Sequence, residues 1–324
     1  MKDRAGLYMV AQAEQDGHLV PGERGLIVEG TAGNTGIGLT LAANSRGYRT
    51  VIVIPETQSQ EKKDTLRFAG AQVIEVPAVP YANPLNYVHI AKGLAELLKK
   101  ELAGKMNVFY ANQWDNLANR QAHIEGTSQE IWSQLEGKVD AFSCAMGTGG
   151  TLSGCAIGLR QKNPKIFIGL TDPQGALPVN YFTTGTMALT PGSSITEGVG
   201  QGRITGNMRD FRPDACWEIP DAEALEQINS LCFEEGLQVG LSTGLNVAGA
   251  IRVAKKLGPG HTIVTVLCDG AMRYATKMYN PPFLQSRSLP VPEWLDVEKQ
   301  RMLFECDVKA AAEEVITNIK KTIA

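Results

Sequence analysis

Apolar and polar positions follow a repeating strand-then-helix order along the chain. Short aliphatic or β-branched runs predict strands over residues 25–28, 50–54, 73–76, 107–110, 139–144, 166–171 and 262–267. Apolar residues at helical spacing predict helices over residues 36–46, 59–69 and 87–102. Strands that alternate with helices through short connections predict an α/β fold, in which helices cover both faces of parallel sheets.

The end of the chain has a different pattern. One face of a predicted helix is formed by apolar residues that recur every three or four positions, namely Val308, Ala312, Val315, Ile319 and Ile323. Pro290, Pro292 and Trp294 separate this helix from the rest. We therefore expect an N-terminal α/β domain over residues 1–132, a C-terminal α/β domain over residues 133–290 and a helical tail over residues 291–324.

Composition and charge exclude some classes of function. The 324 residues, 43% of them hydrophobic, are enough for a large core. A net charge of −3 without a long basic run argues against a nucleic-acid partner. We expect no signal peptide or membrane segment. The six cysteines show no zinc spacing, so we expect no metal site and interpret them as small buried side chains in a reducing compartment.

A loop of small residues follows the first predicted strand. Residues 29–38 are Glu-Gly-Thr-Ala-Gly-Asn-Thr-Gly-Ile-Gly. Hydroxyls, an amide side chain and free N–H groups at the start of a helix favour an anion. The glycines at 33, 36 and 38 do not have the GxGxxG spacing of dinucleotide-binding loops, whereas a purely structural glycine turn stays open.

A second loop, over residues 147–151, is Gly-Thr-Gly-Gly-Thr and opens a predicted helix that runs through Leu159. Successive small residues at a helix start form a cradle for phosphate, and the loop lacks the Gly-Lys-Ser/Thr ending of a Walker loop.

Two further features carry candidate chemistry. Residues 240–244 are Gly-Leu-Ser-Thr-Gly at another helix start, where Ser242 is a hydrogen-bond partner for a heterocyclic nitrogen or, alternatively, a helix N-cap. Lys2 carries a primary amine that condenses with a cofactor aldehyde, although a lysine near a terminus is ordinarily solvated.

Taken together and in this order, the motifs resemble the fold-type II pyridoxal phosphate enzymes, specifically the cysteine synthase/cystathionine β-synthase family. The resemblance runs from Lys2 to about Trp294. It rests on Lys-Asp-Arg at 2–4, Thr-Ala-Gly-Asn-Thr at 31–35, Asn-Gln-Trp-Asp-Asn at 112–116, Gly-Thr-Gly-Gly-Thr at 147–151, Glu-Gly-Val-Gly at 197–200 and Cys-Asp-Gly at 268–270. It implies a tryptophan synthase β-like fold, with two three-layer α/β domains and pyridoxal 5'-phosphate in the cleft between them.

The resemblance also implies roles for individual residues. Lys2 would be the catalytic residue, forming a Schiff base with the cofactor and moving the α-proton of the substrate. The cofactor would also be bound by Asn34, Gly147, Thr148, Gly149, Gly150, Thr151 and Ser242. The amino-acid substrate would be bound by Thr31, Asn34, Thr35, Gln113 and Gly198. A neutral hydroxyl at the pyridine nitrogen, from Ser242, would favour β-elimination.

The implied reaction forms L-cysteine from an O-activated serine, O-acetyl-L-serine above all, and sulfide through an aminoacrylate intermediate. Cystathionine β-synthase activity, serine sulfhydrylase activity and an impaired, truncated isoform that only binds partners remain alternatives. The expected partners are a second copy of the chain and a serine acetyltransferase. The expected compartment is the cytoplasm, with the mitochondrion left open.

The start of the chain carries one more expectation. Family members have strands before the lysine, so the resemblance implies an N-terminal truncation. Terminal residues fray unless something holds them, and Lys2 has almost no chain in front of it. We therefore expect a less stable and less active protein than one with the upstream elements.

Overall fold

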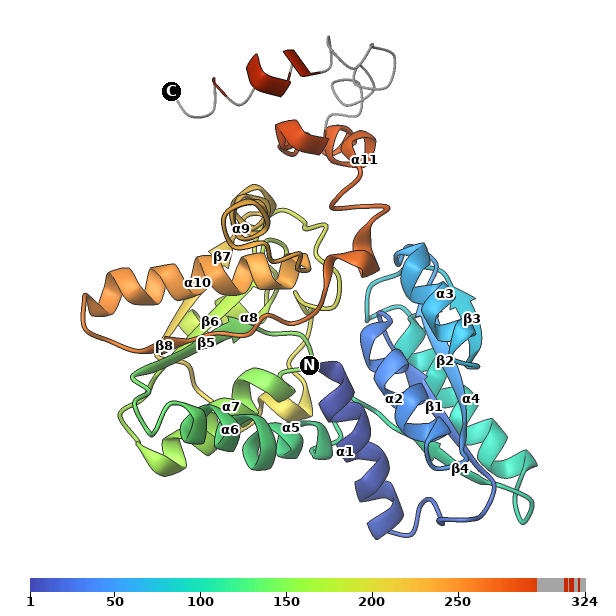
Figure 1. Cartoon of the computed structure of the whole chain (residues 1–324). Coiled ribbons are helices and arrows are strands. Elements are labelled where there is room, and N and C mark those ends of the chain that lie inside the picture. Colours follow the sequence, from blue (N-terminus) through green and yellow to red (C-terminus); the bar gives the residue numbers. More distant parts are fainter. Residues whose placement is uncertain (296–311, 314, 318–319, 321–324) are drawn as a thin grey trace. The chain divides into compact units, whose positions relative to one another are not determined.

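The computed structural model describes residues 1–295, 312–313, 315–317 and 320 (Figure 1). Its contacts divide the chain into two units, Met1–Tyr274 and Ala275–Ala324. The first unit holds both sheets and every predicted site residue. Of the apolar positions expected on the tail helix, Ala312 and Val315 are described; both are helical and exposed, and the others lie outside the described residues.

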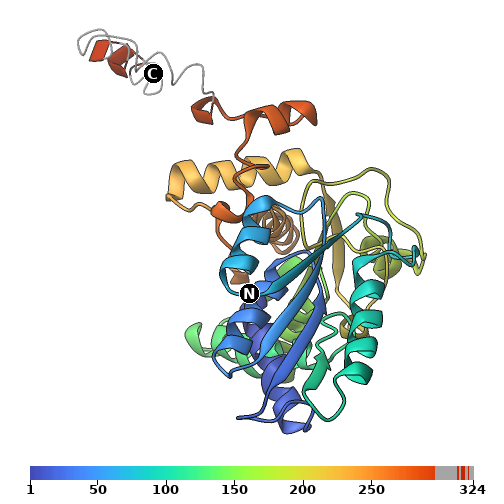
Figure 2. The same cartoon turned by 90° about the vertical axis from the view of Figure 1, so that its right-hand side faces the viewer.

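The first sheet has four parallel strands in the order β3-β2-β1-β4. Its strands are β1 (Gly25–Gly30), β2 (Arg49–Pro55), β3 (Gln72–Val76) and β4 (Asn107–Tyr110). Helices lie on both sides of this sheet (Figure 2). Apolar side chains that alternate along β1 and β2 face these helices. One face is covered by α1 (Lys2–Gln15), α2 (Asn34–Asn44) and α3 (Gln60–Phe68), and the other by α4 (Tyr87–Glu101).

The second sheet has the same parallel arrangement, in the order β7-β6-β5-β8. Its strands are β5 (Ala141–Ala145), β6 (Phe167–Pro173), β7 (Ala215–Ile219) and β8 (Ile263–Val264). One face packs on α7 (Gly150–Lys162) and α8 (Pro178–Thr184), and the other on α10 (Leu241–Leu257) with α9 (Asp221–Glu235) against it. Between the sheets along the chain lie α5 (Ala118–Ala122), a π-helical turn (His123–Thr127) and α6 (Ser128–Gln134). The second unit contains α11 (Pro281–Ser286).

The predicted α/β fold with parallel sheets is confirmed, and every predicted strand lies within two residues of an observed one except the last. The strand expected over residues 262–267 is wrong in length, because only Ile263–Val264 pairs with β5. Beyond it, the Cys268 N–H donates to Thr243 Oγ1 at 3.1 Å, which directs the chain toward α10. The sequence patterns did not predict α1, β7 or α9.

Helix α1 is held by an unusually close contact with α2. A Cβ atom on Gly6 would lie 2.8 Å from the Gly38 carbonyl carbon, and one on Gly38 would lie 2.8 Å from Asp3 Cα. Buried Met9 and Val10 add apolar contacts with β1 and α2. The packing fastens Lys2 from its C-terminal side, and Figure 1 shows the start of α1 between the two sheets.

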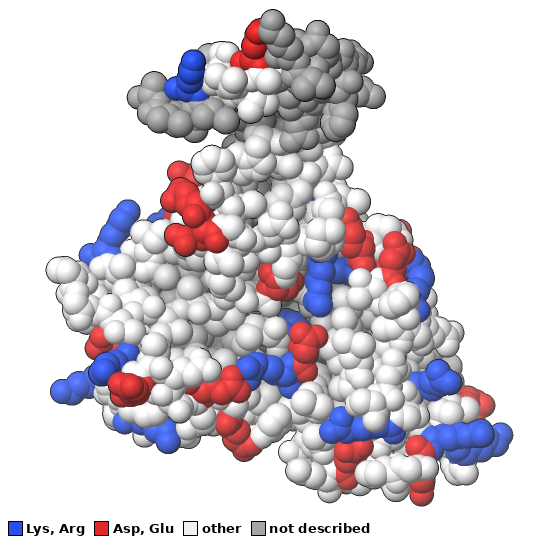
Figure 3. Space-filling view, in the orientation of Figure 1, with Lys and Arg blue, Asp and Glu red and all other residues white. Residues whose placement is uncertain are grey.

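Surface charge is mixed. On the face shown in Figure 3, acidic and basic side chains are interspersed rather than gathered into one basic patch. Within the described part of the chain, no helix is both long and apolar enough to span a membrane.

Close packing of α10 on β6 generates a stability prediction. A Cβ atom on Gly249 would overlap Thr171 Cγ2, whereas one on Gly93 in α4 would meet nothing within 4 Å. We expect Gly249→Ala to lower the free energy of unfolding by about 1–3 kcal/mol through overpacking. Gly93→Ala, the matched control, should raise it by up to about 1 kcal/mol, because alanine favours a helix interior. Urea unfolding of both variants checks this, and equal stability of the two would contradict the packing argument.

Candidate active site

The predicted catalytic lysine lies against the predicted phosphate loop. A Cβ atom on Gly147 would be 3.5 Å from Lys2 Nζ and would overlap the carbonyl oxygen of Gly198. Lys2 comes from α1, Gly147 follows β5, and Gly198 lies in the long segment before β7. Three sequence-predicted site residues from distant parts of the chain therefore meet at one place, and glycine at 147 is required for the close approach.

The environment of Lys2 favours a neutral amine. Burial lowers the pKa of Lys2, and the nearby Cys268, Cys144 and Asp269 oppose that shift without reversing it. A neutral amine has a free lone pair, so it can act as a nucleophile or accept a proton. Burial therefore prepares this side chain for the chemistry that the sequence predicted.

Residues 147–151 form a tight turn at the N-terminus of α7, where backbone N–H groups lack partners within the helix. Gly149 has φ 91°, and a Cβ atom there would lie 2.6 Å from Met208 Cγ. A Cβ atom on Gly150 would overlap the Asn119 side chain. Both glycines are therefore required by the close packing, and the loop offers backbone donors in the manner of an anion site.

Two residues that the sequence did not indicate brace this loop. Asn119 Nδ2 donates to Thr148 Oγ1 at 2.9 Å and also to the Gln113 carbonyl at 2.7 Å. Thr151 Oγ1 lies 3.2 Å from His123 Nε2. Burial lowers the pKa of His123 to about 3, so the ring is neutral at physiological pH.

The predicted carboxylate loop, residues 31–35, joins β1 to α2. Thr35 Oγ1 donates to Gln113 Oε1 at 2.5 Å, and Gln113 Nε2 donates to the Gly30 carbonyl at 3.0 Å. Thr31 Oγ1 accepts from the Gly33 N–H at 3.1 Å. The structure thus brings Thr31, Thr35 and Gln113 together at the carboxyl end of β1, where ligands of open parallel sheets bind.

The side chain of Asn34 is bound by other protein groups. Its Nδ2 donates to Asp269 Oδ2 at 2.6 Å and to the Tyr274 hydroxyl at 3.2 Å, while its Oδ1 accepts from Arg273 Nη1 at 2.8 Å. The sequence motifs included Asn34 and Asp269 but did not indicate Arg273 or Tyr274. The predicted contact of Asn34 with a cofactor and a substrate stays a prediction.

Ser242 lies buried at the start of α10, beside the Cys268 thiol, to which its hydroxyl is hydrogen-bonded. Asn246, one turn further, accepts from the Ala145 N–H at 2.6 Å and donates to the Val266 carbonyl at 2.6 Å. These bonds join α10 to β5 and to the segment that follows β8. The contact of Ser242 with a ring nitrogen remains a prediction.

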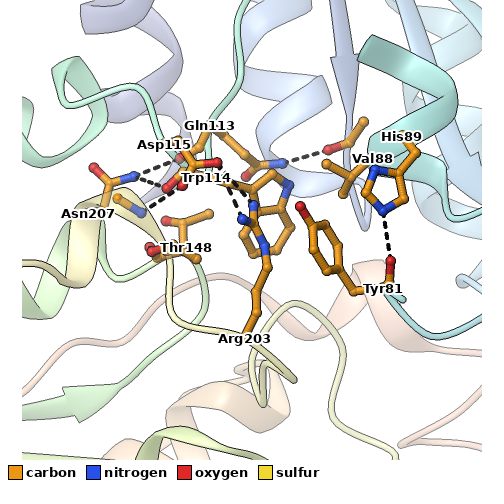
Figure 4. Close-up of polar contacts among 12 residues, drawn as sticks. Tyr81, Val88, His89, Gln113, Trp114, Asp115, Thr148, Arg203 and Asn207 are labelled. Atoms are coloured by element: carbon orange, nitrogen blue, oxygen red, sulfur yellow. Dashed lines mark hydrogen bonds and ion pairs between the residues drawn. The ribbon is translucent and has the colours of Figure 1, made fainter. Parts of the chain in front are cut away.

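Residues 203–207 fasten the segment that contains Gln113 (Figure 4). Asn207 Nδ2 donates to the carbonyls of Gln113 and Trp114 at 2.9 and 2.7 Å. Arg203 lies 3.3 Å from Asp115 Oδ2, with its guanidinium 4.3 Å from the centre of the Tyr81 ring. Arg203 and Asn207, which precede β7 of the second sheet, therefore hold the segment that follows β4 of the first sheet.

A buried ion pair makes a second link between the two halves. Lys62 Nζ lies 2.5 Å from Glu197 Oε2, with side chains 1% and 5% exposed, and the Ser59 N–H donates to the other Glu197 oxygen at 3.2 Å. A Cβ atom on Gly33 would lie 2.8 Å from Lys62 Cδ. The lysine stem thus lies beneath the carboxylate loop, and its charge holds the segment that precedes Gly198.

The residues fit pyridoxal phosphate. A buried lysine amine lies beside a loop of backbone donors at a helix N-terminus, which suits an aldehyde and a phosphate on one small molecule. Two buried carboxylate oxygens near the amine, Glu29 Oε1 and Asp269 Oδ1, lack a hydrogen-bond partner in the protein. Such orphaned polar atoms mark a site in which a polar ligand is expected.

A family comparison decides the class. Residues 1–269 match the model of the family described as pyridoxal-phosphate dependent enzyme. The chain belongs to this family. It is 48% identical to cysteine synthase 1 of Neurospora crassa over 91% of this chain and 78% of the relative, and 48% identical to cysteine synthase 1 of Emericella nidulans over 91% and 79%. A solved O-acetylserine dependent cystathionine β-synthase from Helicobacter pylori is 30% identical, with a TM-score of 0.75 over 86% of this chain and 84% of that one.

Across the described residues, no group of three or more His, Cys, Asp and Glu side chains is arranged to hold a metal ion. Cys144 and Cys155 are buried as expected, whereas Cys216, Cys232 and Cys268 are half-buried; all five are free thiols. Cys306 lies outside the described residues.

Glu29 generates a pH prediction. Burial raises the pKa of its carboxyl to about 8, even though the Gln113 N–H donates to Oε2 at 3.3 Å. An unfolded carboxyl titrates near ~4.3, so between these values the folded chain holds a proton that the unfolded chain has lost. This group therefore lowers stability as pH rises through the window, by up to about 1.4 kcal/mol per pH unit.

Glu29→Gln should remove that contribution, so its free energy of unfolding should fall less steeply with pH than that of the parent chain. Urea unfolding at several pH values checks the difference. Glu14→Gln, at a half-buried carboxylate on α1, serves as the control. Parallel curves for the parent and Glu29→Gln would show that the carboxyl is ionised in the folded protein.

Proposed function

We propose that this protein is a pyridoxal phosphate-dependent cysteine synthase. It forms L-cysteine from an O-activated L-serine, O-acetyl-L-serine above all, and sulfide. The observation that carries the proposal is the meeting of the Lys2 amine with Gly147 and Gly198 in one buried site. The names of the fungal relatives support the product, and the name of the solved Helicobacter pylori enzyme supports an acetylated serine.

The cofactor supplies an electron sink, when bound, for the pair released as the substrate loses its α-proton. Lys2 would hold the cofactor through its amine, and the freed amine would take the α-proton on Nζ. The backbone donors and hydroxyls of residues 147–151 hold the phosphate group. Ser242 would hold the pyridine nitrogen with a neutral hydroxyl, and the ring would then be less electron-poor than with a carboxylate partner.

The substrate carboxylate binds at residues 31–35 and at Gln113. Thr35 and Gln113 already point at each other, so a carboxylate replaces their mutual hydrogen bond with charge-assisted ones. The segment around Gly198 covers the site and excludes water, which protects the reactive species formed after the β-substituent has left. Sulfide then adds to the β-carbon, and Lys2 returns a proton to the α-carbon.

Cystathionine formation is a second candidate, because the solved structure that the chain resembles at 30% identity is named as an O-acetylserine dependent cystathionine β-synthase. Cystathionine formation differs from cysteine formation only in the sulfur nucleophile that adds to the β-carbon. Homocysteine supplied in place of sulfide discriminates the two.

The test is to supply the purified chain with the cofactor and to measure cysteine formed from sulfide with O-acetylserine, O-phosphoserine or serine. We expect the highest kcat/KM with O-acetylserine. No product from any of the three donors would overturn the proposed function, and faster turnover with homocysteine than with sulfide would favour the second candidate.

Lys2 should be the residue that holds the cofactor. Borohydride reduction followed by peptide mapping should place the adduct on Lys2, and Lys2→Ala should lower kcat by about 10²–10⁴-fold through loss of the base. Lys63→Ala is the control, because Lys63 of α3 forms an ion pair with Glu75 of β3 and is not a predicted site residue. An adduct on any other lysine would refute the assignment.

Gln113→Ala and Thr35→Ala should weaken amino-acid binding but leave the cofactor bound, since these side chains face the carboxylate and not the phosphate. Loss of a charge-assisted hydrogen bond costs about 1.5–3 kcal/mol, or about 10- to 150-fold in KM. Gln121→Ala, at a half-buried glutamine on α5 whose amide donates to Glu125, is the control. Absorbance titration separates the two kinds of binding, and loss of the cofactor from either variant would contradict the division of roles.

The family resemblance extends the proposal to assembly and compartment. We propose a homodimer that contacts a serine acetyltransferase and acts in the cytoplasm. Light scattering and co-sedimentation with the acetyltransferase test the assembly, and fractionation of the source cells tests the compartment.

A further inference from the structure

Two carboxyl side chains face each other across neighbouring strands of the second sheet. Asp172 of β6 pairs in register with Glu218 of β7, so their side chains project from the same face of the sheet. The preceding residue, Thr171, contacts α10, which places Asp172 on the opposite face. Asp172 is 0% exposed and Glu218 is half-buried.

Three of the four carboxyl oxygens of this pair are buried and poorly partnered. Both oxygens of Asp172 and Oε2 of Glu218 are buried, and none of the three makes a hydrogen bond of normal geometry. A buried carboxylate with no cation beside it is costly, and two of them side by side are costlier still. Burial accordingly raises the pKa of Asp172, the Gly200 N–H opposes the shift, and the Glu218 charge adds to it.

Among the described residues, few groups face Asp172. From β7 it faces Glu218 and the Cys216 thiol, and the Cys216 thiol is hydrogen-bonded to Thr183 of α8. From the segment that lies against the phosphate loop, it faces the Gly200 N–H. The charged side chain of that segment, Glu197, is bound to Lys62. These neighbours supply no positive charge to Asp172 and Glu218, so a bound proton is what offsets their charges.

Asp172 also lies beneath the segment that covers the candidate active site. A Cβ atom on Gly200 would lie 2.7 Å from Pro173 Cγ, and the Leu177 N–H donates to the Gln201 carbonyl at 2.8 Å. Two residues earlier, the Gly198 carbonyl lies against Gly147 in the phosphate loop. Gly200, which contacts Asp172, and Gly198, which contacts the phosphate loop, therefore lie in one short stretch of chain.

We propose that Asp172 and Glu218 share one proton, and that this proton holds residues 197–200 in place over the cleft. The proton lies on Asp172 and is donated to a Glu218 oxygen, while the second Asp172 oxygen faces the Gly200 N–H. Loss of the proton to water leaves two adjacent anions, one fully buried and one half-buried. Water must then enter to solvate them, and the segment above loosens. Asp172 is in this sense a positioning residue that acts through Gly198 and Gly200.

Hydrogen exchange tests the proposal without relying on the proposed reaction. Peptides that cover residues 194–202 are followed in the full chain with pyridoxal phosphate, from about pH 6 to about pH 10, a range that spans strongly raised carboxyl pKa values. After correction for the intrinsic pH dependence of exchange, we expect their protection to fall about tenfold or more, since one pKa unit is a tenfold change.

Asp172→Asn and Glu218→Gln each leave at most one charge, so the protection should stay level in both across the pH range. Glu235→Gln, at an exposed carboxylate on α9, should behave as the parent chain does. If the parent shows no fall, or if both variants retain it, the shared proton is refuted. If Asp172→Asn fails to fold, Glu218→Gln decides the result alone.

Kinetics give a second readout. If the segment loosens at high pH, the KM for the amino-acid substrate should rise with pH in the parent and stay level in Asp172→Asn, while kcat follows the same profile in both. A merely structural role for Asp172 would instead lower stability at every pH. Matching KM profiles for the parent and Asp172→Asn would overturn the proposal, and absence of turnover in both would bear on the proposed function alone.

Discussion

The contact between α1 and α2 determines where the catalytic amine lies. Gly6 and Gly38 let the two helix backbones approach so closely that either Cβ atom would meet main-chain atoms. A larger side chain at either position would push α1 outward, and its first residue would move with it. This packing and the burial of Met9 and Val10 hold the start of α1, and Lys2 with it, in place.

Close packing that only glycine permits also shapes the phosphate loop. Gly147, Gly149 and Gly150 each lie where a Cβ atom would press on a neighbour, respectively the Gly198 carbonyl, Met208 and Asn119. The loop is therefore shaped by what surrounds it as much as by its own torsion angles. Asn119 and His123 supply the polar contacts that keep Thr148 and Thr151 oriented, which preorganises the donors before any ligand arrives.

Local sequence patterns predicted the strands well, because β-branched runs such as residues 50–54 are long and uninterrupted. They missed α1, whose apolar face is made largely of alanine and glycine, and β7, where Glu218 breaks the apolar run. At the site, motifs of small residues predicted the loops that the structure brings together. The braces Asn119, His123, Arg273 and Tyr274 carry no pattern of their own, because their importance arises only from contacts across about 30 to 240 positions of sequence.

The ion pair of Lys62 and Glu197 restricts which substitutions these two positions can accept during evolution. Removing one partner of a buried pair leaves an uncompensated charge and costs about 3–5 kcal/mol, a large part of what keeps a protein folded. Replacing both together with apolar side chains of similar volume is far less costly. The two positions, 135 residues apart, are thus expected to change together or not at all as the lineage diverges. Descendants that keep one charge and lose the other should be rare.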